Sequence, residues 1–273
     1  MPQVRAKKSL GQHFLKDIGI ARQIADTMPS GPVLEIGPGM GVLTQFLLHN
    51  KNIQLTAIEL DSESVSYLCS HFPELHLSTD NSKKGINRLI QGDALKIDWY
   101  QLYQSHFSVI GNYPYNISSQ IFFKVLDYKD YITVCSGMIQ KEVAERISAQ
   151  PGKKAYGILS VLLQVYYNIE YLFTVDSNVF APPPKVQSAV IRLTRNSRNQ
   201  LDCDETLFRT IVKQSFNQRR KQIRNSLKQW VNEHIPPNKV GELYEKEVFS
   251  KRPEQLSVDD FVELTNLLQL CQN

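Results

Sequence analysis

The stretch GPVLEIGPGMGVLTQFLLHN (residues 31–50) constrains the fold more than any other part of this chain. It opens with an apolar run that is typical of a buried strand, and it continues into three alternate glycines, Gly37, Gly39 and Gly41. Apolar residues at helical spacing follow. Because glycine lets the backbone turn sharply and approach a ligand closely, the stretch predicts a strand, a ligand-binding loop and a helix in succession.

The same alternation of strand-like and helix-like segments continues through the first two hundred residues. Further strand-like runs occupy 53–60, 106–112 and 131–139, and a second helix-like segment occupies 61–72. This order predicts an α/β fold with a mostly parallel sheet and helices on both faces. Between 171 and 195, two strand-like runs flank a proline-rich loop, which predicts an antiparallel pair added at a sheet edge.

The pattern changes after a polar stretch at 195–205 and is helical to the end. In the last helix-like segment, Ser257 is the expected N-cap, and Asp260 three residues later favours a capping box. We therefore predict two domains, an α/β domain over 1–198 and a small all-helical domain over 199–273. A polar run at 78–88 is expected to form a surface excursion.

Composition excludes several classes of protein. No apolar run approaches the roughly 20 residues that span a bilayer, and the basic N-terminus lacks the apolar core of a signal peptide. The four cysteines lie more than 60 residues apart, which argues against a zinc site or a small disulfide framework. We expect a cytoplasmic protein that holds no metal and contacts no membrane.

The positive charge of the chain is local. Seven basic residues and no acid lie between Arg209 and Lys228, and the rest of the chain holds 24 basic and 27 acidic residues. A local basic block indicates a phosphate-rich partner, although a solvated helix face explains it equally well. If the partner is RNA, the expected contacts are Arg219, Arg220, Lys221 and Arg224.

The glycine spacing points to one kind of cofactor. The nicotinamide fingerprint G-x-G-x-x-G would place its third glycine at Val42, so a nicotinamide oxidoreductase is disfavoured. The spacing instead suits the acidic-x-G-x-G-x-G loop of S-adenosyl-L-methionine enzymes, in which Glu35 supplies the acid.

Two further acids fall where neighbouring strands should end. Glu59 lies 22 residues after Gly37, where a carboxylate can accept hydrogen bonds from both ribose hydroxyls. Asp93 ends a third expected strand and could bind the amine of the cofactor's adenine. Either acid alone fits a solvated loop, but their joint position at successive strand ends favours a cofactor site.

The stretch GNYPYN (111–116) lies at the end of the fourth expected strand. This position is beside the expected cofactor, where its methyl group would be. The Asn112 side-chain oxygen and the Tyr113 carbonyl could accept hydrogen bonds from an adenine amine, with Pro114 fixing that carbonyl. Tyr115 could stack on the flipped base. Alone, the N-x-P-Y tetrapeptide also fits an ordinary turn; with the glycine loop and acids, it indicates methyl transfer to adenine.

Seven motifs resemble, in order along the chain, those of the adenine dimethyltransferases of ribosomal RNA. They are KSLGQHFL (8–15), EIGPGMGVLT (35–44), IELD (58–61), GDAL (92–95), GNYPYNIS (111–118), FAPPPKVQSAVIRL (180–193) and FNQRRKQIRNSL (216–227). The resemblance covers nearly the whole chain. It favours the bacterial small-subunit type, which dimethylates two adjacent adenosines near the 3′ end of 16S rRNA during ribosome assembly.

The resemblance implies a Rossmann-like S-adenosyl-L-methionine-dependent domain, a small helical domain and specific site residues. Phe180 is implied as a second aromatic near the target base. The partner implied is 16S rRNA in the small ribosomal subunit or its precursor, bound by a monomer. The cofactor contacts implied, with Gly39 and Ala94 from the same motifs, are His13, Leu15, Gly37, Gly39, Glu59, Asp93, Ala94 and Asn112.

The chain departs from the family at two places. The family usually has leucine where this chain has Tyr113, and the polar run at 78–88 is longer than usual.

Two alternatives stay open: a macrolide-resistance methylase that modifies large-subunit RNA, and a ribosome-assembly or transcription factor that binds RNA without catalysis. The FAPPPKVQSAVIRL and FNQRRKQIRNSL stretches favour the small-subunit type over the first, and Asn112, Glu59 and the glycines argue against the second.

Overall fold

The computed structural model describes residues 4–78 and 87–272. The chain divides into two compact units, Met1–Ala144 with Asn168–Arg195 and Glu145–Tyr167 with Asn196–Asn273. The predicted domain boundary at 198/199 stays a prediction, and the second unit also takes in residues 145–167. Most of the expected excursion at 78–88 lies outside the described residues. Within the described part of the chain, no helix is long and apolar enough to cross a membrane.

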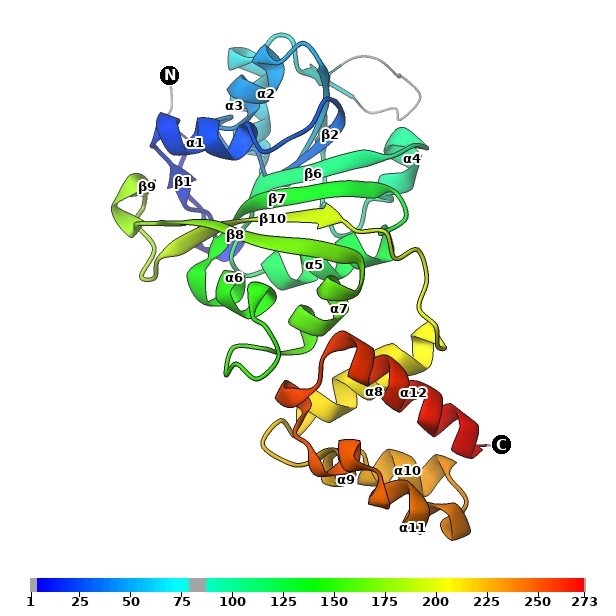
Figure 1. Cartoon of the computed structure of the whole chain (residues 1–273). Helices are drawn as coiled ribbons and strands as arrows, with labels where there is room; N and C mark the ends of the chain where they lie inside the picture. Colours follow the sequence, from blue (N-terminus) through cyan, green and yellow to red (C-terminus); the bar gives the residue numbers. More distant parts are fainter. Residues whose placement is uncertain (1–3, 79–86, 273) are drawn as a thin grey trace. The chain divides into compact units, whose positions relative to one another are not determined.

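Eight strands of the described residues form one sheet, in the order β4-β5-β3-β2-β6-β7-β10-β8 (Figure 1). Neighbours from β4 to β7 are parallel, and β10 is antiparallel to β7. The expected mostly parallel sheet is confirmed. The strands span Gly31–Ile36 (β2), Ile53–Glu59 (β3), His76–Leu77 (β4), Arg88–Gln91 (β5), Phe107–Asn112 (β6), Ile132–Gln140 (β7), Tyr167–Val175 (β8) and Ser188–Arg195 (β10).

The direction in which the sheet is built reverses at β2. From β2 the chain moves outward through β3 and β5, and it then returns to place β6 on the other side of β2. Parallel α/β sheets bind ligands at the carboxyl ends of the strands beside such a switch point. The ends of β2, β3 and β6 are therefore where a site is expected.

Helices flank the sheet of the first unit. Asp17, Asp61 and Asp98 each precede a helix and accept a hydrogen bond from an amide of its first turn, which satisfies a donor that the helix itself cannot pair. Figure 1 shows α1 and α5 on opposite sides of the strands. The α-helices span Ile18–Ala25 (α1), Thr44–His49 (α2), Ser62–His71 (α3), Trp99–Tyr103 (α4), Ser118–Asp127 (α5) and Lys141–Ser148 (α6), the last crossing the unit boundary.

A separate short pair joins the N-terminal segment to the proline-rich loop. Strand β1 (Phe14–Leu15) runs antiparallel to β9 (Phe180–Ala181), so that Leu15 lies opposite Phe180. Single 3-10 turns precede these strands at Lys8–Leu10 (η1) and Ser177–Val179 (η2). This pair anchors the N-terminal segment beside the sheet.

The second unit is helical, as predicted. In its core Phe216 on α8 packs 5.9 Å from Phe261 on α12, ring centre to ring centre. The predicted cap is present, because Asp260 accepts from the Ser257 amide at 2.7 Å and its own amide donates back to the Ser257 hydroxyl. The helices span Ile158–Tyr166 (α7), Glu205–Asn217 (α8), Ile223–Ser226 (α9), Lys228–His234 (α10), Pro237–Glu245 (α11), Glu247–Ser250 (η3), Pro253–Gln255 (η4) and Val258–Gln272 (α12).

Candidate active site

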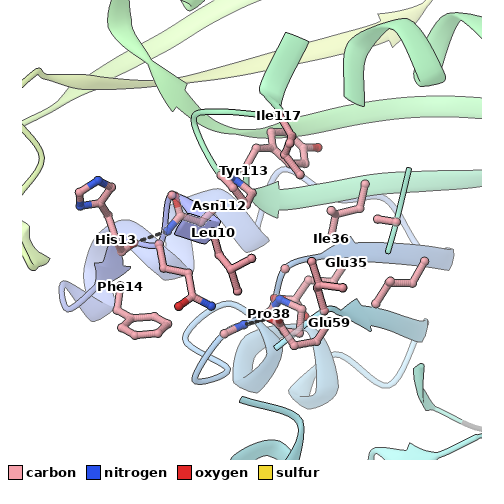
Figure 2. Close-up of a pocket in the computed structure, with 18 of the residues that line it drawn as sticks. Leu10, His13, Phe14, Glu35, Ile36, Pro38, Glu59, Asn112, Tyr113 and Ile117 are labelled. Atoms are coloured by element: carbon pink, nitrogen blue, oxygen red, sulfur yellow. Dashed lines mark hydrogen bonds between the residues drawn. The ribbon is translucent and has the colours of Figure 1, made fainter. Parts of the chain in front are cut away.

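A pocket opens where the carboxyl ends of β2, β3 and β6 meet (Figure 2). Five segments contribute to its lining, with residues 10–15, 35–40 and 42–43, 58–60, 92–95 and 112–117. The structure therefore brings together segments that lie up to about a hundred residues apart in the sequence. All the residues predicted for cofactor binding lie in this lining: His13, Leu15, Gly37, Gly39, Glu59, Asp93, Ala94 and Asn112.

The glycine loop is shaped by positive backbone φ angles. Gly37 and Gly39 have φ of 67° and 56°, a region that residues with a side chain rarely adopt. A Cβ at Gly39 would lie 3.0 Å from the Phe14 ring. The loop therefore presents bare backbone to the pocket, with Phe14 packed against it.

Glu35 lies beneath this loop. Its side chain is 1% exposed and accepts a hydrogen bond from the Thr44 hydroxyl at 2.8 Å. Burial raises the pKa of this carboxyl to about 8, because a buried charge loses its hydration. Near neutral pH the Glu35 carboxyl is therefore mostly protonated, and it supports the loop as a neutral hydrogen-bonding group.

Glu59 ends β3 and ties it to the glycine loop. One oxygen accepts from the Gly39 amide at 2.9 Å and the other from the Asp61 amide at 2.8 Å. Burial raises the pKa of Glu59, while these amide hydrogen bonds oppose the rise. A carboxylate offers about four acceptor sites, so these hydrogen bonds leave capacity for a ligand hydroxyl. The structure thus places an oriented carboxyl group at this wall of the pocket (Figure 2).

Asp93 lies beyond the end of β5, on another wall. Its side chain accepts from the Leu95 amide at 2.9 Å, which fixes the loop that also carries Ala94. Lys96 lies 3.8 Å from the other carboxylate oxygen. Within the described ranges, no group of three or more His, Cys, Asp or Glu side chains could hold a metal ion.

The orientation of the Asn112 amide is set by the N-terminal segment. The Asn112 Nδ2 donates to the His13 carbonyl at 3.0 Å (Figure 2). A carbonyl can only accept, so the amino group must face His13 and the Asn112 oxygen must face elsewhere. Among the described residues, no side chain or amide donates to this oxygen. The pocket thus contains a fixed amide with a free acceptor.

The Tyr113 ring packs inside the protein. Its side chain is 1% exposed, and its hydroxyl donates to the Ser136 carbonyl on β7 at 2.9 Å. A Cβ at Gly111 or Gly137 would come within 2.8 Å of the ring, so these two glycines provide its space. The Tyr113 amide also donates to the Met138 carbonyl at 3.0 Å. The side chain and the amide therefore both anchor this residue to β7.

Pro114 and Tyr115 also line the pocket. The Tyr115 ring is half-buried and lies 5.3 Å from the His13 ring, centre to centre. Its hydroxyl contacts the Ser188 hydroxyl on β10. The structure therefore brings Tyr115 to the same pocket as Asn112, where its ring is partly accessible.

Phe180 lies elsewhere. Its side chain is 1% exposed and belongs to the apolar core, and it is not part of the pocket lining. The ring could contact a base only if the proline-rich loop moved. The role implied for Phe180 stays a prediction.

The N-terminal segment contributes more than the sequence reasoning expected. Lys7 forms ion pairs with Asp61 and, at 3.0 Å, with Glu63. The His13 ring donates from Nδ1 to the Pro182 carbonyl at 2.8 Å. The segment is therefore tied to both the end of β3 and the proline-rich loop. No hydrophobic periodicity signals this role, and only the KSLGQHFL motif could have indicated it.

The four predicted RNA-binding residues belong to the second unit and differ in what they contact. Arg219 donates to the carbonyls of Lys153 and Lys154. Arg224 donates to the Phe249 carbonyl at 3.4 Å. Arg220 and Lys221 are exposed. The structure thus adds two exposed cations, Lys153 and Lys154, beside the block that the sequence identified.

Bare glycine backbone, two carboxyl groups at strand ends and a fixed amide fit a nucleoside with a reactive methyl group. This is the site of a Rossmann-like methyltransferase, and its cofactor is S-adenosyl-L-methionine. Glu59 and Asp93 can accept from hydroxyl and amine groups, and Gly37 and Gly39 permit close approach.

Comparison with known proteins narrows this class. A family model described as ribosomal RNA adenine dimethylase matches residues 3–269. Ribosomal RNA small subunit methyltransferase A of Parabacteroides distasonis is 60% identical over 272 residues, covering 98% of this chain and 96% of the relative. The protein of the same name from Porphyromonas gingivalis is 57% identical over 274 residues, covering 98% and 100%. The chain belongs to the ribosomal RNA adenine dimethylase family.

Two solved structures share the fold over nearly the whole chain. A dimethyladenosine transferase from Plasmodium falciparum has a TM-score of 0.73 at 26% identity, covering 92% of this chain and 96% of the other. The 23S rRNA methyltransferase ErmE has a TM-score of 0.63 at 25% identity, covering 93% and 99%. The expected fold and family are therefore confirmed, whereas the roles of individual residues stay predictions.

Proposed function

We propose that this chain methylates N6 of two adjacent adenosines near the 3′ end of 16S rRNA, in the small ribosomal subunit or its precursor. The product is N6,N6-dimethyladenosine, and the reaction takes part in ribosome assembly. The observation that carries the proposal is the Asn112 amide, which is fixed by the His13 carbonyl and lines the same pocket as the glycine loop.

The adenine amine needs help to act as a nucleophile, because its lone pair is delocalised into the ring. The Asn112 oxygen and the Tyr113 carbonyl accept hydrogen bonds from its two N–H groups and favour a more tetrahedral nitrogen. Both acceptors are held before substrate arrives, Asn112 by His13 and Tyr113 by β7. Preorganised acceptors stabilise developing positive charge without a cost of reorganisation.

Tyr115 holds the base that carries this amine. Its partly accessible ring stacks on the flipped adenine, and Pro114 fixes the backbone between the two acceptors and the ring. A strong base is unnecessary, because the nitrogen becomes acidic once it is alkylated and its proton passes to water. Positioning and hydrogen bonding therefore supply most of the rate.

The cofactor is held by the rest of the lining. S-adenosyl-L-methionine supplies an electrophilic methyl group when bound. Glu59 would accept from the ribose hydroxyls and Asp93 from the adenine amine, and the glycines Gly37 and Gly39 would let the cofactor approach the backbone closely. His13, Leu15 and Ala94 cover the remaining walls. These roles are supported by the common lining of the pocket.

The second unit binds RNA phosphates. Arg220 and Lys221 offer exposed charges, and Arg219 ties their segment to the turn that carries Lys153 and Lys154. Clustered exposed cations attract a polyanion and release its counterions on binding. Arg224, whose guanidinium also donates to a backbone carbonyl, adds a further positive charge to the block.

The names of the relatives support the small subunit as substrate. Two relatives at 57% identity or more are named for the small subunit, whereas the large-subunit enzyme ErmE is 25% identical. We place the reaction in the cytoplasm, where bacterial ribosomes assemble. A monomer suffices, since one chain supplies every proposed cofactor contact.

The test is incubation of the purified chain with S-adenosyl-L-methionine and small subunits that lack these methyl groups. Mapping of modified adenines should find dimethylation at the adjacent pair in 16S rRNA. Large subunits serve as the control and should stay unmodified. Modification of large-subunit RNA alone, or of neither, would overturn the proposal.

A further inference from the structure

Ser188 is the first residue of β10, and it lies beneath the proposed base-stacking residue. Its side chain is fully buried, and its hydroxyl contacts the Tyr115 hydroxyl. The two residues lie 73 positions apart in the sequence. Neither the motif that contains Ser188 nor the chemistry proposed above assigns this serine a role.

The position of Ser188 is fixed by the sheet. Strand β10 pairs with β7 from Ser188 to Thr194, and Ser188 lies opposite Gln140. Strand β7 in turn pairs with β6, which ends at Asn112. Ser188 and Asn112 therefore belong to one set of paired strands, β10-β7-β6, which fixes the position of both side chains.

Tyr115, in contrast, belongs to a turn. Its carbonyl accepts from the Ser118 hydroxyl at 3.2 Å, which holds its backbone, but the ring can still rotate about two side-chain bonds. The His13 ring lies near one part of it. A contact at the far end of the ring, such as the one with Ser188, removes the remaining freedom most effectively.

We propose that Ser188 is a positioning residue whose hydroxyl holds the Tyr115 ring in the orientation that stacks on the target adenine. This inference rests on the proposed function of Tyr115. Because Ser188 belongs to β10, the same paired strands fix the positions of both the Asn112 amide and the Tyr115 ring. A small misplacement of a reacting group lowers the rate steeply.

The test compares Ser188→Ala, Tyr115→Phe and the double variant, each of which breaks the same contact. Single-turnover methylation of small subunits should slow by about 10- to 100-fold in each variant. The double variant should be no slower than either single one, since the contact can be lost only once. The affinity for S-adenosylhomocysteine should not change.

Ser108→Ala is the matched control. Ser108 is a buried serine on β6 whose hydroxyl lies 3.1 Å from the Thr133 hydroxyl, so its loss breaks a similar pair away from the pocket. Its methylation rate should equal that of the wild type. If Ser188→Ala and Tyr115→Phe also keep the full rate and lose only thermal stability, the contact is structural and the inference is wrong.

Tyr115→Ala separates this inference from the proposed function. If Tyr115→Ala is inactive while Tyr115→Phe and Ser188→Ala are normal, the ring matters but its tether does not, which overturns only the inference. If Tyr115→Ala itself keeps the full rate, the stacking role fails too. Should Ser188→Ala not fold, Tyr115→Phe alone tests the contact, because it leaves the buried serine in place.

Discussion

At the scale of single residues, the Tyr113 side chain shows how a departure from the family pattern is accommodated. The family usually has leucine at this position, and the structure buries the larger tyrosine ring against β7. The proposed chemistry uses only the backbone carbonyl of Tyr113. The side chain is therefore a structural anchor for that carbonyl.

This division predicts that Tyr113 variants lose stability more than activity. Tyr113→Phe removes the hydrogen bond from the Tyr113 hydroxyl to the Ser136 carbonyl and should cost about 1 kcal/mol of unfolding free energy. Tyr113→Leu, the residue usual in the family, should cost about 2–3 kcal/mol because it leaves a cavity. Urea unfolding and single-turnover rates measure the two effects. A folded Tyr113→Leu enzyme without activity would contradict the account.

The protonated state of Glu35 predicts a pH-dependent stability. Between pH 4.5 and about 8, Glu35 ionises in the unfolded chain but stays protonated in the folded one. The wild type therefore loses stability as pH rises through this window. Glu35→Gln mimics the neutral form and has no such loss.

The free energy of unfolding of both proteins is measured with urea at about pH 5 and about pH 8. Between these two pH values, the difference in unfolding free energy should change in favour of Glu35→Gln by on the order of a few kcal/mol. Glu59, whose pKa is also raised, is present in both proteins, so its contribution largely cancels. A stability difference that stays constant with pH would show that Glu35 is charged in the folded state.

Several residue contacts could not be predicted from sequence, because they join distant segments. The His13 carbonyl orients Asn112 from 99 residues away. The contact between Tyr115 and Ser188 has no local pattern either. Sequence motifs named the residues of the pocket, but three-dimensional proximity decides which way an amide faces and which aromatic ring is accessible. Phe180 shows that sequence does not reveal which aromatic ring is accessible, since its motif implied a base contact and the fold buries its side chain.

At the scale of elements, strand ends were the most predictable features. The strands ending near Ile36, Glu59 and Asn112 follow from apolar runs bounded by glycines or polar residues, and the structure confirms them. The sheet order β2-β6 follows less directly, because pairing between distant strands is decided by packing. Because β2, β3 and β6 are neighbours and parallel, they end at the same edge of the sheet, and the motifs at their ends line one pocket.

The Tyr113 ring fits between β6 and β7 only because Gly111 and Gly137 have no side chains there. A Cβ at Gly137 would lie 2.2 Å from the Gly111 carbonyl oxygen and 2.7 Å from the Tyr113 ring. Gly137→Ala should therefore cost about 3 kcal/mol through overpacking, as measured by urea unfolding. Gly241→Ala on α11 is the control, since no atom lies within 4 Å of its Cβ. Equal stability of the two variants would show that the space between β6 and β7 can widen freely.

At the scale of the whole chain, charge and catalysis belong to different compact units. The second unit carries the basic block, whereas every residue of the pocket belongs to the first. The pattern of apolar residues and the Ser257 cap predicted the helical character of the second unit. It did not predict that residues 145–167 belong to it, because that segment precedes β8 in the chain and only tertiary packing assigns it.

The separation predicts that RNA affinity can be weakened without loss of cofactor binding. Neutralising Arg220 and Lys221 should lower the magnitude of the salt slope for RNA binding by about 2, as measured by titration at several salt concentrations. Lys239→Gln with Lys246→Gln, on the same unit but outside the basic block, is the control. An unchanged slope for Arg220→Gln with Lys221→Gln would rule out phosphate contacts at these positions.

The central claim is that the Asn112 amide activates the adenine amine, and Asn112→Ala tests it most directly. Single-turnover methylation of small subunits, measured beside calorimetric binding of S-adenosylhomocysteine, separates catalysis from cofactor affinity. We predict that methyl transfer falls by about 1,000-fold while cofactor affinity changes by less than about 10-fold. Turnover at the wild-type rate by a folded Asn112→Ala protein would contradict the account.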